Sequence, residues 1–165
     1  MNRRQLLLGL AASPLLHAVP SMAAARSILV YKNPSCGCCS GWVEHLKSAG
    51  FSVATKDVVD TAPERKRLGL PERFSSCHTA TIEGYVVEGH VTAADVQRLL
   101  ATRPDAIGLA VPGMPVGSPG MEVDGRVDPY EVLIEEEGSL HRRANWRPAY
   151  ADVTRLGRIA WGLSG

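Results

Sequence analysis

Three of the four cysteines of this 165-residue chain stand within four residues, as Cys36-Gly37-Cys38-Cys39, and the fourth is Cys77. The adjacent Cys38 and Cys39 cannot easily bond to each other, and three clustered thiols share only one distant partner. Two structural disulfides therefore fit this pattern poorly. Thiols packed so closely in the sequence indicate redox exchange, binding of a soft metal ion, or both.

Cys36 and Cys39 have the C-x-x-C spacing of thioredoxin-type redox pairs. A strand-like run precedes them and a helix-like run follows, so they are expected at a helix N-terminus, whose partial positive charge lowers the pKa of a thiol. Cys38 departs from the redox motif, because a third thiol offers competing disulfides to an exchange enzyme but adds a ligand to a metal site. Metal binding and thiol–disulfide exchange through Cys36 and Cys39 both remain open at this point.

Ligand type narrows the choice of metal. Sites made only of thiolates suit Cu(I), Zn(II) or iron–sulfur clusters. A single Zn(II) usually takes four sulfurs from two separated knuckles, and the adjacent Cys38 and Cys39 make that geometry awkward. Cu(I) accepts two or three sulfurs and shares bridging thiolates, and equal numbers of Cu(I) ions and thiolates cancel in charge, which lowers the cost of burying them. The pattern favours a polynuclear copper–thiolate site.

The elements that must position these thiols follow from the hydrophobic pattern. Apolar alternation and helical spacing predict strands and helices in the order β-α-β-α-β-β-α, over residues 27–32, 42–49, 51–58, 61–69, 79–83, 85–88 and 92–103. This order predicts an α/β, thioredoxin-like fold with a central mixed sheet flanked by helices. The cysteine cluster then lies at the first junction between strand and helix.

Cys77 is expected to face the cluster from the loop that enters the hairpin, where a thioredoxin-like chain carries a cis-proline. Four sulfurs would then converge on one pocket. His78 should lie at the rim of that pocket, either as an accessory ligand or bonded to the loop backbone, and His90 should have a structural or supporting role. Met114 and Met121 either pass Cu(I) to and from the thiolates or pack their loop onto the domain.

The first 23 residues predict a signal peptide. Arg3 and Arg4 form a basic start, residues 5–19 are apolar, and small residues precede a cleavage point after Ala23 or Ala25. Both the general secretory and the twin-arginine route fit this segment. Its apolar run is too short for a spanning helix, so no membrane insertion is expected after cleavage.

The remaining chain is predicted to form one metal-binding domain over residues 27–137 and an extension over 138–165, to which the sequence gives no role. Residues 104–129 contain five prolines and five glycines and should form a long loop. A strand is expected again at residues 131–135, and the segment from Trp146 is weakly amphipathic. Removal of Arg3 and Arg4 lowers the 18 basic residues to 16, against 17 acidic ones. This balance predicts no binding to nucleic acid.

Several ordered motifs within residues 27–137 resemble the CopG-type periplasmic copper-resistance proteins. They are Lys32-Asn33-Pro34-Ser35-Cys36-Gly37-Cys38-Cys39, Cys77-His78-Thr79-Ala80, Val87-Glu88-Gly89-His90-Val91, Gly108-Leu109-Ala110-Val111-Pro112-Gly113-Met114-Pro115 and Gly117-Ser118-Pro119-Gly120-Met121-Glu122.

The resemblance implies a thioredoxin-like fold, a periplasmic location and a cluster of several Cu(I) ions. The implied ligands are the cysteines of the C-x-C-C and C-H-T motifs: Cys36, Cys38, Cys39 and Cys77. Copper ions are the implied partners, together with another periplasmic copper-handling protein, and a redox role between copper states has been proposed for the family.

Two enzyme functions compete with copper binding. The first is a periplasmic thiol–disulfide oxidoreductase using Cys36 and Cys39. The second is an arsenate-reductase-like activity, because residues 31–36 resemble the nucleophile loop of that family, although export argues against it.

Overall fold

We analysed a computed structural model of the chain, which describes residues 25–135 and 144–146. The predicted signal peptide (residues 1–23) and most of the predicted extension (residues 138–165) lie outside the described residues. None of the helices within the described ranges is long and apolar enough to cross a membrane.

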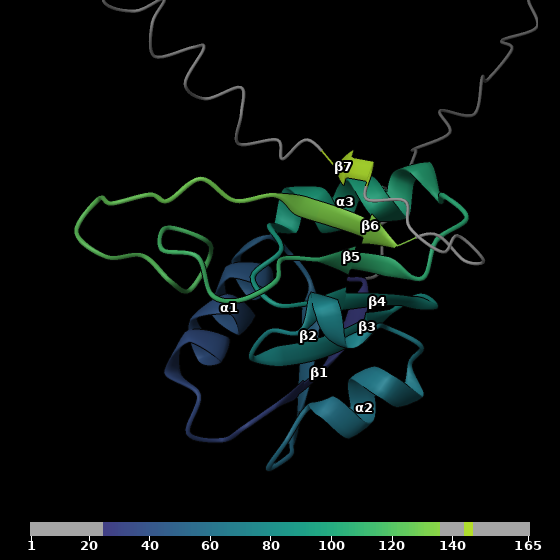
Figure 1. The fold of residues 1–165 in the computed structure, drawn as a ribbon, viewed down its shortest axis with the longest axis horizontal. Coiled ribbons are helices and arrows are strands. Elements are labelled where there is room, and N and C mark those ends of the chain that lie inside the picture. Colours follow the sequence, from purple (N-terminus) through teal and green to yellow (C-terminus); the bar gives the residue numbers. More distant parts are fainter. Residues whose placement is uncertain (1–24, 136–143, 147–165) are drawn as a thin grey trace, which may run out of the picture.

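The centre of the fold is a mixed sheet, drawn in Figure 1, with the strand order β2-β1-β3-β4-β5-β6-β7. Neighbouring strands run parallel in the pairs β1–β2 and β4–β5 and antiparallel in the others. The strands are β1 Ser27–Lys32, β2 Ser52–Asp57, β3 His78–Ile82, β4 Tyr85–Glu88, β5 Gly108–Ala110, β6 Val132–Glu135 and β7 Ala144–Trp146.

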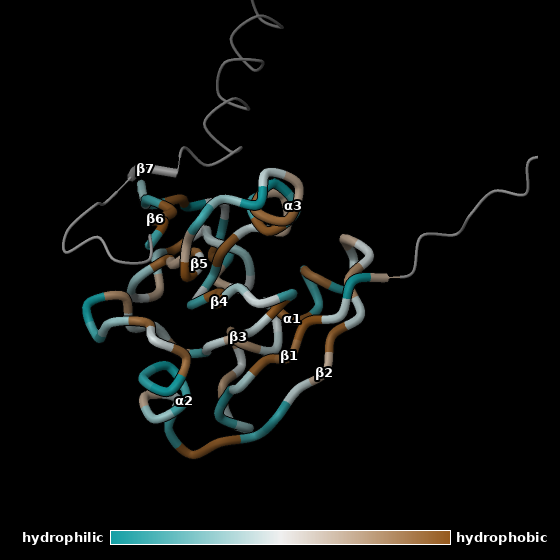
Figure 2. Tube along the Cα trace, turned by 90° about the vertical axis from the view of Figure 1, so that its right-hand side faces the viewer, coloured by the Kyte–Doolittle hydropathy of each residue, from teal (hydrophilic) through white to brown (hydrophobic). Residues whose placement is uncertain are grey.

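Helices cover both faces of this sheet. They are α1 Gly37–Ser48, α2 Ala62–Arg67, the short 3-10 helix η1 Glu72–Phe74 and α3 Ala93–Thr102. Val87 packs in one apolar cluster with residues of α1 and α3, whereas its neighbour Val86 packs in a second cluster with Leu70 and Phe74 on the α2 and η1 side. Figure 2 shows hydrophobic residues along β1 and on the side of α3 that faces the strands. The predicted thioredoxin-like α/β fold is confirmed.

Helix α1 begins earlier than the hydrophobic spacing predicts. It starts at Gly37 rather than at Trp42, because Cys36 is the N-cap and its sulfur accepts the backbone N–H of Cys39 at 3.4 Å. The first turn carries few apolar side chains, so periodicity could not reveal it, whereas the expected position of Cys36 at the helix N-terminus is confirmed. The cysteine cluster therefore occupies the first turn of α1 itself.

The predicted loop over residues 104–129 is wrong in one part. Residues Gly108–Ala110 form β5, which lies between β4 and β6 inside the sheet. A side chain at Gly108 would collide with the backbone carbonyl of Val86, so glycine permits this strand to pack at that point. The long connection is residues 111–131, and it projects beyond the sheet on the side of α1 (Figure 1).

Candidate metal centre

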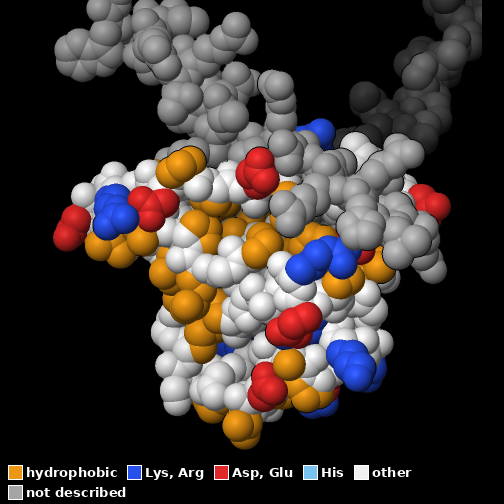
Figure 3. All heavy atoms as spheres, viewed as in Figure 1, with side chains coloured by type: hydrophobic (Ala, Val, Ile, Leu, Met, Phe, Trp, Pro, Cys, Tyr) orange, Lys and Arg blue, Asp and Glu red, His pale blue; other side chains and the backbone are white. Residues whose placement is uncertain are grey.

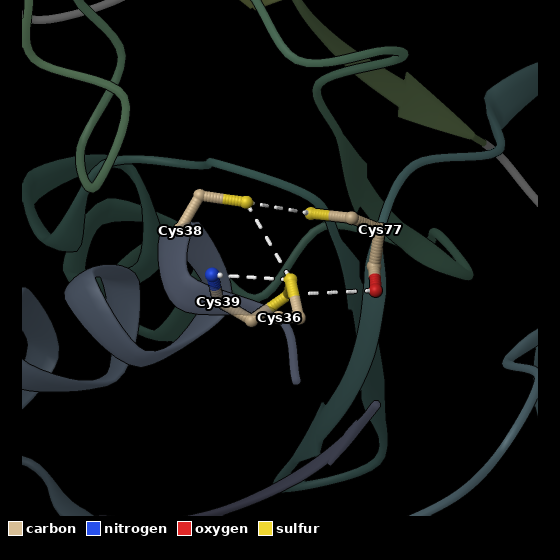
Figure 4. A group of neighbouring side chains, drawn as sticks. All are labelled: Cys36, Cys38, Cys39 and Cys77. Atoms are coloured by element: carbon tan, nitrogen blue, oxygen red, sulfur yellow. Dashed lines mark hydrogen bonds between the residues drawn. A yellow bond between two sulfur atoms is a disulfide. The ribbon is translucent and has the colours of Figure 1, made fainter. Parts of the chain in front are cut away.

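The four cysteines meet where the N-terminus of α1 faces the loop that enters β3 (Figure 4). Their sulfur atoms all lie within 4.8 Å of one another. The sulfur of Cys38 is 3.5 Å from that of Cys36 and 3.8 Å from that of Cys77. The predicted convergence of four sulfurs is confirmed, and Cys77 closes the cluster from the opposite side.

Cys36 and Cys39 are joined by a disulfide, with their Cα atoms 5.3 Å apart, while Cys38 and Cys77 are free thiols. A sulfur in a disulfide is a poor metal ligand, since metals bind the thiolate. The described state is thus the oxidised form of the cluster, in which two sulfurs remain available. Reduction of the disulfide would release the other two sulfurs.

Cys39 is fully buried, and its sulfur lies 3.5 Å from the backbone carbonyl of Cys77. Cys36, Cys38 and Cys77 are partly exposed, so the cluster can be reached from solvent on one side. Burial, and then the neighbouring Cys38, raises the pKa of the Cys77 thiol to about 12. Without a cation, Cys77 is therefore protonated at neutral pH, and a bound metal ion would have to displace that proton.

The prediction that His78 lies at the rim of the pocket is wrong, because its side chain is fully buried. It is the first residue of β3, and its ring packs against that of Trp42 with the ring centroids 4.3 Å apart. Its Nδ1 is 3.3 Å from the sulfur of Cys77. Burial, and then the neighbouring His90, lowers the pKa of His78 to about 3, so the ring is neutral at physiological pH.

His90 is the second buried imidazole beside Cys77, with its Nε2 3.1 Å from the cysteine sulfur. Its Nδ1 lies 2.8 Å from the backbone carbonyl of Pro119. Because that carbonyl can only accept a hydrogen bond, Nδ1 carries the proton and Nε2 presents its lone pair to Cys77. Burial lowers the pKa of His90 as well, although the Pro119 carbonyl opposes the shift. The structural or supporting role of His90 stays a prediction.

Part of the 111–131 connection lies directly on α1. A side chain added at Gly120, where φ is +85°, would stand 2.5 Å from the carbonyl oxygen of Cys38 and 2.6 Å from the backbone nitrogen of Trp42. Glycine at this position thus lets the loop approach the turn that carries the cysteines. The same approach places Pro119 against His90.

The two methionines of this connection are placed differently. Met114 is 52% exposed, whereas Met121, next to Gly120, is partly buried. Met121 is held by backbone hydrogen bonds to Ser118 and Gly117. Their predicted roles, copper transfer or loop packing, stay predictions. Figure 3 shows hydrophobic side chains gathered on the flank of the molecule beside this connection.

A functional residue that sequence reasoning missed is Glu88. It is fully buried at the end of β4 and stands opposite Thr79 in the β3–β4 hairpin. Its carboxylate accepts the backbone N–H of Ser76 at 2.8 Å and the hydroxyl of Thr79 at 2.6 Å. It also accepts a hydrogen bond from the guanidinium of Arg65 at 3.1 Å. One carboxylate therefore fixes the residues on both sides of Cys77.

No local pattern reveals this role, because an acid at the end of a strand most often faces solvent. Burial raises the pKa of Glu88, while Thr79, Ser76 and the charge of Arg65 act against the shift. Arg65 itself has a side chain only 4% exposed and also pairs with Glu72 at 2.8 Å. The buried carboxylate is thus matched by a buried cation and by two hydrogen-bond donors.

Two further side chains of α1 make contacts across the fold. Trp42 is fully buried, and its indole N–H donates to the carbonyl of Val91 at 2.7 Å. His45 is half-buried, and its Nε2 accepts the backbone N–H of Ala93 at 3.0 Å. The N-terminus of α3 needs acceptors for its first N–H groups, and His45 supplies one of them.

Comparison with known proteins gives three findings. A family described as a protein of unknown function, DUF411, matches residues 74–121. Two solved structures, both described as copper resistance protein CopG and distinguished as form 1 and form 2, are 43% identical to the chain. They give TM-scores of 0.68 and 0.69, and the matches cover 75% and 74% of this chain and 98% of each of those chains. No curated protein sequence matches.

The identity and the share of each chain that is covered place the relationship well above a likeness of fold alone. The chain belongs to the family of CopG copper resistance proteins.

Proposed function

We propose that this protein binds Cu(I) in copper resistance, through the thiolates of Cys36, Cys38, Cys39 and Cys77. The observation that carries the proposal is the convergence of all four sulfurs within 4.8 Å in a member of a copper-resistance family. Four soft sulfur donors in one place favour Cu(I) over harder cations. The protein would hold the ion for sequestration or for transfer to another protein.

The proposed site holds several Cu(I) ions rather than one. Sulfurs 3.5 and 3.8 Å apart are close enough to bridge neighbouring copper ions. Cys39 is fully buried, and none of the charged residues described above contacts the cysteine sulfurs, so a neutral copper–thiolate cluster would be cheaper to bury than a charged one. Equal numbers of Cu(I) ions and thiolates give that neutrality.

The remaining parts of the chain complete this proposal. Residues 1–23 would direct export to the periplasm, residues 27–137 would form the metal-binding domain, and residues 138–165 would form a separate extension. The connection of residues 111–131 carries the half-exposed Met114 next to the domain. A thioether in that position suits transfer of Cu(I) to or from a periplasmic partner, with Met121 closer to α1.

Titration of the fully reduced protein with Cu(I), in competition with a chromophoric Cu(I) chelator, tests the proposal. We expect several ions per chain and a copper X-ray absorption spectrum with sulfur ligands and short copper–copper scattering. The Cys77→Ser variant should bind far less copper, whereas His45→Gln, a half-buried histidine variant outside the cluster, should bind as the wild type does. Binding of a single ion would contradict the cluster, and a shell rich in nitrogen would move the site to the histidines.

A second candidate function is thiol–disulfide exchange through Cys36 and Cys39, and their disulfide in this structure favours it. The free thiol of Cys38 lies 3.5 Å from the sulfur of Cys36, so it would compete with an external substrate for the disulfide. An exchange enzyme should reduce insulin, and it should keep that activity in Cys77→Ser. This candidate would be excluded if the wild type does not reduce insulin while Cys77→Ser loses copper binding.

A further inference from the structure

We propose that residues 147–165, which lie outside the described residues, dock as an amphipathic helix in a groove between the 111–131 connection and β6. The groove would thus be an interaction surface whose partner is a later segment of the same chain. The extension would be separate from the domain along the sequence and packed onto it in space. This proposal does not depend on the proposed copper function.

The groove lies where the 111–131 connection enters β6, and its volume is about 490 Å³. Six of its seven lining residues have apolar or aromatic side chains, and the seventh is Glu131. The six are Pro112, Met114, Pro115, Pro129, Tyr130 and Leu133. The three prolines make its walls rigid, because the ring of proline fixes φ. A segment that fits this groove should be apolar on one face and should carry a positive charge next to Glu131.

The same connection exposes an unusual share of apolar surface. Four large hydrophobic side chains of the described residues are exposed, and three of them, Met114, Val123 and Val127, belong to this connection. Figure 3 shows hydrophobic and acidic side chains next to one another on the part that projects from the domain. Exposed apolar side chains that gather on one segment with a polar rim indicate a contact surface, whereas scattered ones do not.

The position at which the chain leaves the described fold selects the occupant. In the antiparallel pairing of β6 with β7, Trp146 stands opposite Val132. The chain after Trp146 therefore continues alongside residues 129–131, which line the groove. A segment tethered at the edge of its own binding surface has a high effective concentration there, so it outcompetes a second copy of the protein. The predicted signal peptide leads into β1, which β3, β4 and β5 separate from β6.

The sequence of this segment suits the groove. Its apolar residues follow one another at intervals of four and three, which is the spacing of one face of a helix. They are Ala149, Val153, Leu156, Ala160 and Leu163. Pro148 stands before the first of them, and proline is favoured in the first turn of a helix. A helix of this length is marginal by itself in water, so it needs a surface on which to pack its apolar face.

Charge also favours this pairing. Residues 147–165 contain three arginines and one aspartate, a formal charge of +2, whereas residues 111–131 contain four acids and one arginine, a charge of −3. That arginine, Arg126, already pairs with Asp128 at 3.1 Å. Asp124 and Glu131 form no ion pair with another described residue. If the register of β6 and β7 continues by one residue, Arg147 stands opposite Glu131 and gives the first contact.

Photo-cross-linking in the full chain tests this docking. The photoreactive residue p-benzoylphenylalanine replaces Met114 in the groove. In the matched control it replaces Val59, an exposed hydrophobic residue that follows β2 at the opposite edge of the sheet. Unlabelled and isotopically labelled protein are mixed and irradiated, and the joined peptides are identified by mass spectrometry. We expect position 114 to join to residues 147–165 of the same molecule, and position 59 not to join to them.

Two variants of the segment separate docking from chance contact. Leu156→Asp places a charge within the apolar stripe and should lower the yield from position 114 about tenfold, because burial of a leucine side chain changes an equilibrium by about that factor. Thr154→Asp adds the same charge away from the stripe and should leave the yield unchanged. In the chain without the photoreactive residue, the amides of residues 147–165 should exchange hydrogen more slowly in the wild type and in Thr154→Asp than in Leu156→Asp.

Three results would overturn the proposal. Links that join only labelled to unlabelled chains would show that a second copy occupies the groove. Absence of links from position 114 to residues 147–165, or equal yields from positions 114 and 59, would show that the segment does not dock there. Equal yields and equal hydrogen exchange in Leu156→Asp and Thr154→Asp would show that the apolar stripe does not hold the segment.

Discussion

Glu88 offers the sharpest test of how the fold places Cys77. Replacement of Glu88 by alanine would remove the acceptor for the Ser76 N–H, for the Thr79 hydroxyl and for one arm of the Arg65 guanidinium. All three donors would be left without that partner in a region from which water is largely excluded. The loop that carries Cys77 would lose its hydrogen bond to the side chain of β4 at Ser76.

The magnitude follows from the burial of both charges, since the Arg65 and Glu88 side chains are 4% and 0% exposed. Removal of one partner of such a buried pair typically costs about 3–5 kcal/mol of unfolding free energy. Glu88→Gln keeps one carbonyl oxygen for Ser76 and should cost less, about 1–3 kcal/mol. Glu72, the other partner of Arg65, is 78% exposed, so Glu72→Ala should cost no more than about 1 kcal/mol.

Urea unfolding of the reduced, metal-free variants measures these differences, and Cu(I) competition measures the effect on the site. We expect Glu88→Gln to remain folded and to bind Cu(I) more weakly, while Glu72→Ala behaves as the wild type in both assays. Equal unfolding free energies for Glu88→Ala and Glu72→Ala would refute the reasoning about the buried pair. Unchanged copper affinity in a destabilised Glu88→Gln would refute the link to Cys77.

Two further predictions concern the loop on α1 and the buried histidines. Gly120→Ala should lower the unfolding free energy for two reasons. The positive φ of residue 120 should cost about 1–2 kcal/mol, and the collision of the added Cβ with the backbone of Cys38 and Trp42 should add to this loss. Gly125→Ala, also at positive φ but with open space around it, gives the strain alone, so equal losses in urea unfolding would argue against the contact. Because the pKa of His78 is about 3 when folded and 6.5 when unfolded, the unfolded chain binds the extra proton between these values, and stability falls as the pH decreases. Between pH 6.5 and pH 5 this amounts to about 2 kcal/mol. His78→Phe should show a flatter pH dependence of the unfolding free energy than the wild type, and parallel curves would contradict the assignment.

Much of the fold could be predicted from local patterns. The strand Ser27–Lys32 and the hairpin at Glu83-Gly84 appear as expected, and both turn residues have positive φ. The start of the helix predicted over residues 92–103 is also confirmed, since Thr92 caps α3 and accepts the N–H of Asp95 at 3.1 Å. These features depend on neighbours in the chain, which is why the sequence reveals them.

Features that depend on distant neighbours were missed or misplaced. Gly108–Ala110 is too short to show a strand pattern, and it forms β5 because β4 and β6 lie on either side. His78 was expected at the rim, yet packing against Trp42 buries it. The hydrogen bond from Ala93 to His45 joins the start of α3 to α1, which no local pattern could reveal.

The sequence by itself determined which chemistry is possible, because the number, type and spacing of the cysteines already favour soft-metal binding. It also indicated that Cys77 joins the cluster, through the order of its elements. Only the tertiary structure decided what surrounds Cys77: the imidazoles of His78 and His90, and the carboxylate of Glu88 behind its loop. The reason is physical, since ligand type is a property of a residue, whereas burial and the partners of a side chain are set by the packing of segments distant in the chain.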